Sequence, residues 1–275
     1  GEIRAHHQYH WNGSWDWDEV STPILMPVER AGREFNALVH PGRNGYLWTL
    51  ERQADRIGFV DAEPYVYQNA FSSIDPETGR PTYDPEHTPA TGESVDFCPS
   101  LWGGKDWPPA AYNPDTGLVY IPVNENHCGV IEGREVTYMP GSSYTGARTE
   151  FTLREPEGNI GEIQAWNMNT GEEVWSVEFQ SHNWGGILTT GGNLIFSGGT
   201  SDRYFRAHDA SSGEELWRFR TNSGIIGVPS TFSVDGKQYV AVQSGWGVDA
   251  AGMTARIDQQ RGTRTFVPQG GVVWV

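Results

Sequence analysis

Short apolar runs alternate with turn sequences along most of the chain, and this pattern predicts many short β-strands. Residues 1–11 alternate loosely, and an apolar run bounded by prolines follows at 22–28. Two stronger runs, 35–40 and 46–50, are separated by a turn that contains Asn-Gly, which is a strong hairpin signal. We therefore expect strands in all four places, with an edge-like strand at 22–28.

Two tracts interrupt this pattern. Apolar periodicity fades over residues 51–97 and again over 124–158, where turn residues dominate. We predict that both tracts are long excursions packed on a strand scaffold, because long irregular loops in compact domains are usually functional or covering elements. A third loop is predicted at about 246–270, followed by a last strand at 271–275.

A repeat is the clearest internal signal. The sequence AWNMNTGEEVW beginning at Ala165 is echoed by AHDASSGEELW beginning at Ala207, a separation of 42 residues that also relates Trp175 to Trp217. Repeats of about 40–45 residues built from short strands are typical of β-propeller blades. We expect these two tryptophans to pack one blade against the next.

Composition supports an all-β chain and limits its partners. Glycine (34), proline (17) and tryptophan (12) are abundant, as expected for short strands with tight turns. The 35 acidic and 19 basic residues give a net charge of −16, which argues against nucleic acid as a partner. The acidic balance suits a basic protein partner or serves solubility alone. No apolar run reaches the roughly 20 residues that span a bilayer.

The two cysteines, Cys98 and Cys128, flank a tract rich in glycine and proline, and no C-x-x-C motif occurs. A zinc site or a covalently attached haem is therefore not expected. A structural disulfide and two free buried thiols both fit the sequence, and we favour the disulfide, which implies an oxidising compartment.

The acidic stretch at residues 15–19, WDWDE, carries the candidate chemistry. In an extended segment, Asp16 and Asp18 would project to one side and the two tryptophans to the other. Two carboxylates on one side repel each other unless a cation or a proton lies between them, so the pair suggests a hard metal ion. A surface turn with solvated acids is the alternative.

Several motifs in the same order resemble the quinoprotein alcohol dehydrogenases, the PQQ-dependent enzymes that include methanol dehydrogenase. These motifs are WDWDE, GRNGYLWTLER, FCPSLWGGKDWPP and the two 42-residue repeats. The resemblance implies an eight-bladed propeller, of which residues 1–275 hold roughly four blades at the repeat length seen here. The chain thus looks like the C-terminal half, because no stretch matches the features of the family's N-terminal half.

The resemblance also assigns site residues. Asp16 matches the catalytic base that accepts the proton of the alcohol hydroxyl, and Arg43 matches the arginine beside the C5 oxygen of PQQ. Asp106, Trp184 and Trp246 match positions that contact the cofactor or the substrate cavity. Cys98 and Cys128 match a structural disulfide, in line with the residue-level expectation.

The metal is the discriminating question. Asp16 and Asp18 are the expected ligands in this chain. The position of Asp18 is small and uncharged in calcium enzymes of the family and an aspartate in lanthanide-dependent ones, and Asp106 stands where calcium enzymes usually have Asn. We therefore expect a lanthanide ion, with Ca²⁺ as the alternative.

The function implied by the resemblance is oxidation of a small alcohol to an aldehyde or ketone in the periplasm, with electrons passed to a cytochrome c. The missing N-terminal half of the propeller would be a further partner, and the resemblance leaves room for a homodimer. The alternative is a non-catalytic propeller scaffold of the periplasm, which would keep the repeats but would not need Asp16, Asp18, Arg43 and Asp106 together.

Overall fold

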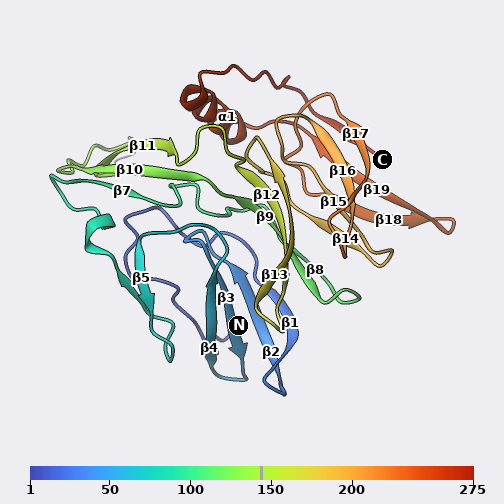
Figure 1. Cartoon of the computed structure of the whole chain (residues 1–275), viewed down its shortest axis with the longest axis horizontal. Helices are drawn as coiled ribbons and strands as arrows, with labels where there is room; N and C mark the ends of the chain where they lie inside the picture. The colour runs from blue at the N-terminus through green and yellow to red at the C-terminus, as the bar shows by residue number, and fades with distance from the viewer. Residues whose placement is uncertain (143–144) are drawn as a thin grey trace.

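A computed structural model describes residues 1–142 and 145–275. Antiparallel sheets stand side by side as an open fan, with one helix at its upper edge (Figure 1). Three sheets have four strands each, paired in simple meander order or nearly so, which is the construction of propeller blades. The predicted all-β propeller architecture is therefore confirmed.

The first sheet is a four-stranded meander in the order β1-β2-β3-β4. Its strands are β1 (Ile24–Arg30), β2 (Arg33–Pro41), β3 (Tyr46–Arg52) and β4 (Ile57–Pro64). Both predicted hairpin strands are present. Strand β4 lies inside the tract predicted as an excursion from residue 51, so that boundary is wrong. The chain completes the first four-stranded sheet before the excursion begins.

The second and third sheets contain the two sequence repeats. The second, in the order β13-β12-β9-β8, consists of β8 (Ala111–Asn113), β9 (Leu118–Asn124), β12 (Gly161–Asn167) and β13 (Glu172–Phe179). The third is a meander of β14 (Leu188–Thr190), β15 (Leu194–Ser197), β16 (Tyr204–Asp209) and β17 (Glu215–Arg220). The register shifts once in each repeat, at Ala165 in one and at Ala207 in the other, so the repeat extends to backbone detail.

The last sheet has three strands, β18 (Ser230–Val234), β19 (Lys237–Ser244) and β20 (Val272–Trp274), in that order. The segment between β19 and β20 was predicted as a loop, but residues Val248–Arg261 form helix α1. Apolar and small residues at positions 250, 253, 254 and 257 are buried, at the i, i+3, i+4, i+7 spacing of a helix face. Gly262 ends the helix in the left-handed conformation.

The two excursions build a smaller layer. The first contains β5 (Phe71–Ile74), β6 (Pro81–Tyr83), the 3₁₀ turn η1 (Pro85–His87) and β7 (Ser94–Phe97). The second is not irregular as predicted, because it forms β10 (His127–Gly133) and β11 (Ala147–Leu153), which pair with β7 in the order β11-β10-β7. Thus two tracts that are far apart in sequence share one sheet (Figure 1).

The blades pack through strands that are buried on both faces. Every residue of β9 is buried. Alternate residues Val119, Ile121 and Val123 join the core shared with the first sheet, while Leu118 and Tyr120 face the third sheet. This period of two places each side chain in one of two inter-blade cores.

Tryptophan packing between blades is seen at Trp175. Its indole nitrogen donates to the carbonyl oxygen of Ala210 at 3.3 Å, and its ring covers Gly213, where a Cβ atom would lie 2.7 Å from the ring. Trp217, at the equivalent position of the next repeat, is 49% exposed. The predicted packing role is therefore confirmed for Trp175. Trp217 is half exposed and lines a cavity between the third and the last sheet, together with Val242 and Trp274.

The N-terminal segment departs from prediction. Residues 1–11 form no strand in the structure, and Ile3 is 88% exposed. No neighbouring strand of the described chain pairs with the segment, and loose alternation alone does not hold a strand in place. Among the described residues, no helix is long and apolar enough to cross a membrane.

Candidate active site

The acidic stretch is anchored by its tryptophans. Trp15 and Trp17 are 0% and 1% exposed and stack on each other with ring centroids 5.1 Å apart. Their indole nitrogens donate to the carbonyl oxygens of His87, at 3.1 Å, and Ser100, at 3.0 Å. Buried, fully paired indoles fix this segment firmly against the excursion layer.

The carboxylates between these anchors face outward. The side chains of Asp16 and Asp18 are 71% and 66% exposed. The expected separation of acids from tryptophans is present, but the segment is a turn and not an extended strand. Asp16 has φ of 61°, and its N–H donates to the carbonyl oxygen of Gly13 at 3.2 Å. Asp is among the residues that tolerate this left-handed conformation best.

Arg43 lies in the turn between β2 and β3, directly opposite the acids. Its guanidinium donates from Nη1 to Asp18 Oδ1 at 2.7 Å and from Nη2 to the carbonyl oxygen of Leu101. Nη2 is also 3.6 Å from Asp106 Oδ2 and 3.9 Å from Asp16 Oδ2. The structure therefore brings Asp16, Asp18, Arg43 and Asp106 together at one point.

The loop that carries Asp106 approaches Arg43 closely because it contains glycine. A Cβ atom on Gly103, which has φ of 71°, would lie 2.6 Å from the carbonyl oxygen of Arg43. The N–H of Gly104 donates to that same oxygen at 3.1 Å. The Gly-Gly pair in the sequence motif thus has a direct steric reason.

Two charged groups on this loop are buried. Burial raises the pKa of the Asp106 carboxyl above its usual value, while the nearby Arg43 guanidinium acts in the opposite direction. Lys105 is 1% exposed, and burial lowers its pKa to about 7 against the opposing charges of Glu19 and Asp106. Perturbed ionisable groups of this kind cluster at functional sites.

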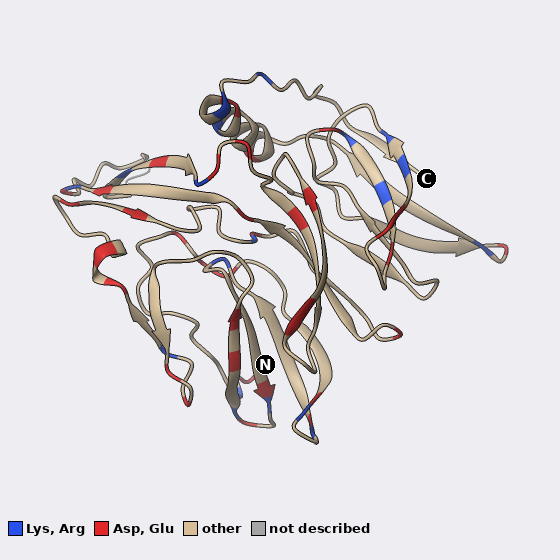
Figure 2. Cartoon of the chain, in the orientation of Figure 1, with Lys and Arg blue, Asp and Glu red and all other residues tan. Residues whose placement is uncertain are grey.

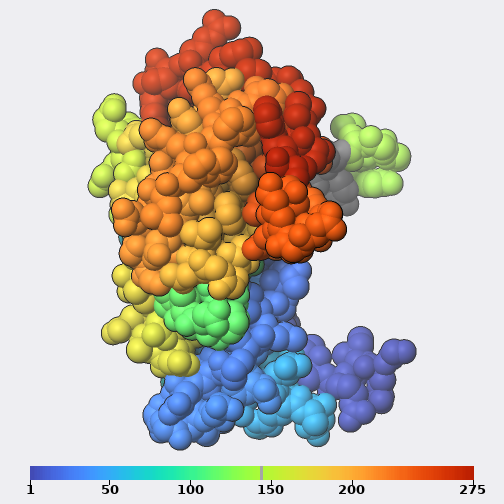
Figure 3. All heavy atoms as spheres, turned by 90° about the vertical axis from the view of Figure 1, so that its right-hand side faces the viewer, coloured from blue at the N-terminus to red at the C-terminus, as the bar shows by residue number. Residues whose placement is uncertain are grey.

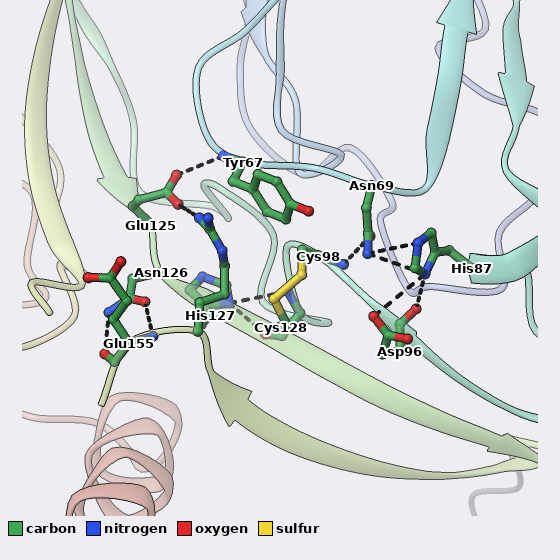
Figure 4. The surroundings of a disulfide bond; sticks show 12 residues. Tyr67, Asn69, His87, Asp96, Cys98, Glu125, Asn126, His127, Cys128 and Glu155 are labelled. Carbon is green, nitrogen blue, oxygen red and sulfur yellow. Dashed lines mark hydrogen bonds and ion pairs between the residues drawn. A yellow bond between two sulfur atoms is a disulfide. The ribbon is translucent and has the colours of Figure 1, made fainter. Parts of the chain in front are cut away.

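The predicted disulfide is present. Cys98, at the end of β7, is bonded to Cys128 on β10. Beside it, the Asn69 side chain receives the N–H of Cys98 at 2.7 Å, and Ser100 contacts the buried ring of His127 (Figure 4). The disulfide therefore ties the start of the Asp106 loop to the excursion sheet.

The two predicted cofactor tryptophans lie in a neighbouring cluster. Trp184 and Trp246 are 4% and 2% exposed and pack with Ala250 and Met253 of α1. Trp246 also donates to Thr254 Oγ1 at 3.3 Å. In the described part of the chain, the guanidinium of Arg43 contacts the three aspartates and Leu101, so the structure does not bring the two tryptophans into this polar group.

A cavity of about 220 Å³ opens beside Asp16 and Arg43. Trp102, Phe151 and Arg256 line it together with the two site residues. Sequence reasoning assigned no role to these three, because Phe151 and Arg256 come from a strand and a helix that were not predicted. For Trp102, its place in the CPSLWGGKDW motif was an available signal.

The donor chemistry of the site suits a hard cation in part. Asp16 and Asp18 offer exposed carboxylate oxygens, the ligands that Ca²⁺ and trivalent hard ions prefer. Within residues 1–142 and 145–275, no group of three or more His, Cys, Asp or Glu side chains could hold a metal ion. Two carboxylates alone fall short of the roughly six to eight oxygen ligands that an ion such as Ca²⁺ takes. Arg43 Nε is buried without a hydrogen-bond partner in the described chain, a donor available to a bound group.

Known proteins of one family resemble this chain. The family model described as "PQQ: Glucose/ethanol/alcohol dehydrogenase, beta-propeller domain" matches residues 176–240. A quinoprotein ethanol dehydrogenase of Pseudomonas putida is 35% identical over 100% of this chain and 44% of its own length. A solved europium-containing methanol dehydrogenase superposes with a TM-score of 0.82 at 34% identity, covering 94% of this chain and 47% of that one.

This chain is similar to the quinoprotein alcohol dehydrogenases. A lanthanide-dependent methanol dehydrogenase of Methylacidiphilum fumariolicum is also 39% identical over 85% of this chain and 38% of its own length. The resemblance drawn from the sequence motifs is thereby confirmed. The chain spans less than half the length of these relatives.

Proposed function

We propose that the native protein is a PQQ-dependent alcohol dehydrogenase that oxidises an alcohol to an aldehyde or ketone. The observation that carries the proposal is the convergence of Asp16, Asp18 and Asp106 on the Arg43 guanidinium, within 3.9 Å. Relatives over the full length of this chain are named as alcohol dehydrogenases of the same cofactor class. A scaffold built from the same blades would not need this group of charges.

Asp16 is the proposed general base. Its carboxylate is 71% exposed and borders the 220 Å³ cavity, where an alcohol hydroxyl can reach it. A carboxylate within hydrogen-bond reach of a substrate hydroxyl can accept its proton as a general base. The hydroxyl proton therefore moves to an oxygen of Asp16 as the carbinol carbon loses hydride.

Arg43 is the proposed electrostatic partner. Its guanidinium stays protonated under all ordinary conditions, so it donates hydrogen bonds and does not act as a base. It is 10% exposed and held by the carbonyl oxygen of Leu101, which aims it in a fixed direction. A fixed donor at the position where negative charge develops stabilises the transition state.

PQQ, when bound, supplies the hydride acceptor. Arg43, Asp106, Trp184 and Trp246 are the residues of this chain proposed to contact it. The unpaired Nε of Arg43 supports this assignment, because a buried donor without a partner is otherwise costly. For Trp184 and Trp246 the support is the sequence resemblance, because both rings are buried against α1 in this chain.

Asp16 and Asp18 are proposed to hold a lanthanide ion, with Ca²⁺ as the alternative. The extra carboxylate of Asp18 favours the ion of higher charge, since affinity rises with the charge of the ligands. In this structure the Arg43 guanidinium offsets the charge of Asp18, because its Nη1 donates to Asp18 Oδ1 at 2.7 Å. An ion held by Asp16 and Asp18 would supply Lewis-acid chemistry at the site.

The rest of the protein is also part of the proposal. Residues 1–275 would form the C-terminal half of an eight-bladed ring, which agrees with the coverage of 44% of a relative's length. Apolar side chains exposed on the last sheet, such as Phe232, Val234 and Val273, support a missing neighbour. Figure 3 shows one face of the molecule, where the C-terminal part of the chain, orange to red, covers the upper portion.

Electron transfer to a periplasmic cytochrome c fits the charge of the chain. The net charge of −16 favours encounter with a basic partner, and acidic residues are spread over most of the elements (Figure 2). A homodimer is a further proposal for the assembled protein. The Cys98–Cys128 disulfide supports an oxidising compartment.

The test uses the purified native protein. It should show the absorbance of bound PQQ, and alcohol should drive reduction of an artificial dye. Removing the metal with a chelator should stop dye reduction, and adding metal back should restore it. A protein that binds PQQ but never reduces the dye with any alcohol would contradict the proposed function.

A further inference from the structure

Glu19 follows the acidic pair directly but turns inward. Its side chain is 15% exposed, against 66% for Asp18. Its Oε2 accepts a hydrogen bond from the His40 ring at 2.6 Å and from the backbone N–H of Arg43 at 3.3 Å. One carboxylate therefore joins the acidic segment to both sides of the Arg43 turn.

The surroundings of this carboxylate are built to receive it. His40 is 2% exposed and stacks on the ring of Tyr9, with centroids 4.8 Å apart. Gly42 leaves space for the contact, because a Cβ atom there would lie 3.0 Å from Glu19 Oε1. The charge of Glu19 also acts on the buried side chain of Lys105, where it opposes the lowering of the lysine pKa by burial.

The turn has further supports that do not reach the acidic segment. Gly42 donates to the carbonyl oxygen of Tyr46 at 2.8 Å, and Tyr65 donates its hydroxyl to the carbonyl oxygen of Gly42 at 2.7 Å. These bonds fix the turn to its own sheet. Among the described residues, the backbone of the turn is joined to the acidic segment by the hydrogen bond from the N–H of Arg43 to Glu19.

We propose that Glu19 is a positioning residue. It holds the Arg43 turn against the acidic segment, so that the Arg43 guanidinium and the Asp16 carboxylate both lie within reach of the same reacting atoms. The proposal rests on the proposed function for its catalytic consequence. A charged acceptor buried with its donors makes stronger hydrogen bonds than an exposed one, so this link is well suited to fix a distance. The last residue of the motif WDWDE therefore has a positioning role, distinct from the roles of its two aspartates.

The experiment compares Glu19→Gln with a matched control, Glu125→Gln, in the native protein. Glu125 is a similar inward carboxylate, 23% exposed, that accepts from the backbone N–H of Tyr67 at 2.8 Å and from Arg154 at 3.1 Å (Figure 4). Each substitution removes one charge from a carboxylate that bonds a backbone N–H and a basic side chain. Only Glu19 contacts the Arg43 turn.

Two readouts are measured. Hydrogen exchange followed by mass spectrometry on a peptide that includes Arg43 should be about tenfold faster in Glu19→Gln and unchanged in Glu125→Gln, since about one hydrogen bond is weakened. With PQQ and metal bound, kcat of dye reduction should fall about tenfold while KM stays within about threefold, because the misplaced donor matters most in the transition state.

Three results would overturn the proposal: unchanged exchange at Arg43, faster exchange with an unchanged kcat, or an equal loss of kcat in Glu125→Gln. If Glu19→Gln does not fold, His40→Gln weakens the same link from the other side, and unchanged exchange there also overturns it. A native protein without alcohol-dependent dye reduction contradicts the proposed function instead, and the exchange measurement still decides whether Glu19 holds the turn.

Discussion

Replacement of Arg43 by lysine tests the site in most detail. The guanidinium makes four polar contacts from two nitrogens: Asp18 at 2.7 Å, Asp106 at 3.6 Å, Asp16 at 3.9 Å and the carbonyl oxygen of Leu101. A lysine keeps the charge but has one compact ammonium on a flexible stem. It can satisfy one or two of these partners and cannot span all of them.

The magnitude follows from these contacts. Loss of a fixed donor to developing negative charge reduces kcat by about 10²–10³, and we expect Arg43→Lys to fall at the lower end because the charge is retained. The free energy of unfolding should fall by about 1–2 kcal/mol, since one or two charge-assisted hydrogen bonds weaken while the ammonium keeps part of the attraction. The loss of rate should therefore exceed what reduced stability alone explains.

The assay is alcohol-dependent dye reduction together with thermal unfolding, and Arg206→Lys is the control. Arg206 on β16 is 6% exposed at its side chain and pairs with Asp202 and Glu215, so its burial and charge resemble those of Arg43. Both variants should lose similar stability, but only Arg43→Lys should lose kcat. A kcat within threefold of the native value for Arg43→Lys, or an equal loss for Arg206→Lys, would refute the role of Arg43.

Two further predictions concern pH and metal. Burial raises the pKa of Glu162 to about 7 from 4.5, so the folded protein holds this proton to higher pH than the unfolded chain, and stability falls as pH rises from 4.5 to 7. Glu162→Gln should therefore raise the free energy of unfolding at pH 8 by on the order of 3 kcal/mol, at about 1.4 kcal/mol per unit of pKa difference. At pH 4 the substitution should change little. An equal effect at both pH values in urea titrations would count against the raised pKa of Glu162. For the metal, apo-protein should regain dye reduction with La³⁺ better than with Ca²⁺, and Asp18→Ala should remove this preference; equal rescue of the native protein by Ca²⁺ would rule out lanthanide selectivity.

Local patterns explain what the sequence could predict. Turn residues and strand alternation, which involve only a few neighbouring positions, determine the hairpin at Asn44-Gly45. They also determine the strands of the two repeats that end at Trp175 and Trp217. The group around Arg43 could be proposed only through the resemblance, because Asp16 and Asp106 are separated by 90 positions along the chain. The disulfide was likewise favoured from the sequence and is present.

Tertiary context explains what the sequence did not show. Strand β10 pairs with β7 from the other excursion and β11 pairs with β10, so neither excursion revealed its sheet alone. Helix α1 has a buried face but mostly polar residues around it, and Gly252 within it weakens the helical pattern. The sequence alone assigned no role to Glu19, because its partner His40 comes from another element.

The most direct test of the central claim is Asp16→Asn in the native protein with PQQ bound. The amide matches the carboxylate in shape, keeps an oxygen toward the cavity and cannot accept the alcohol proton at neutral pH. Absorbance of bound PQQ should be retained while alcohol-dependent dye reduction falls at least 10³-fold, about 4 kcal/mol of transition-state stabilisation. Dye reduction at the native rate by Asp16→Asn would contradict the assignment of Asp16 as the base, and with it the mechanism proposed for this site.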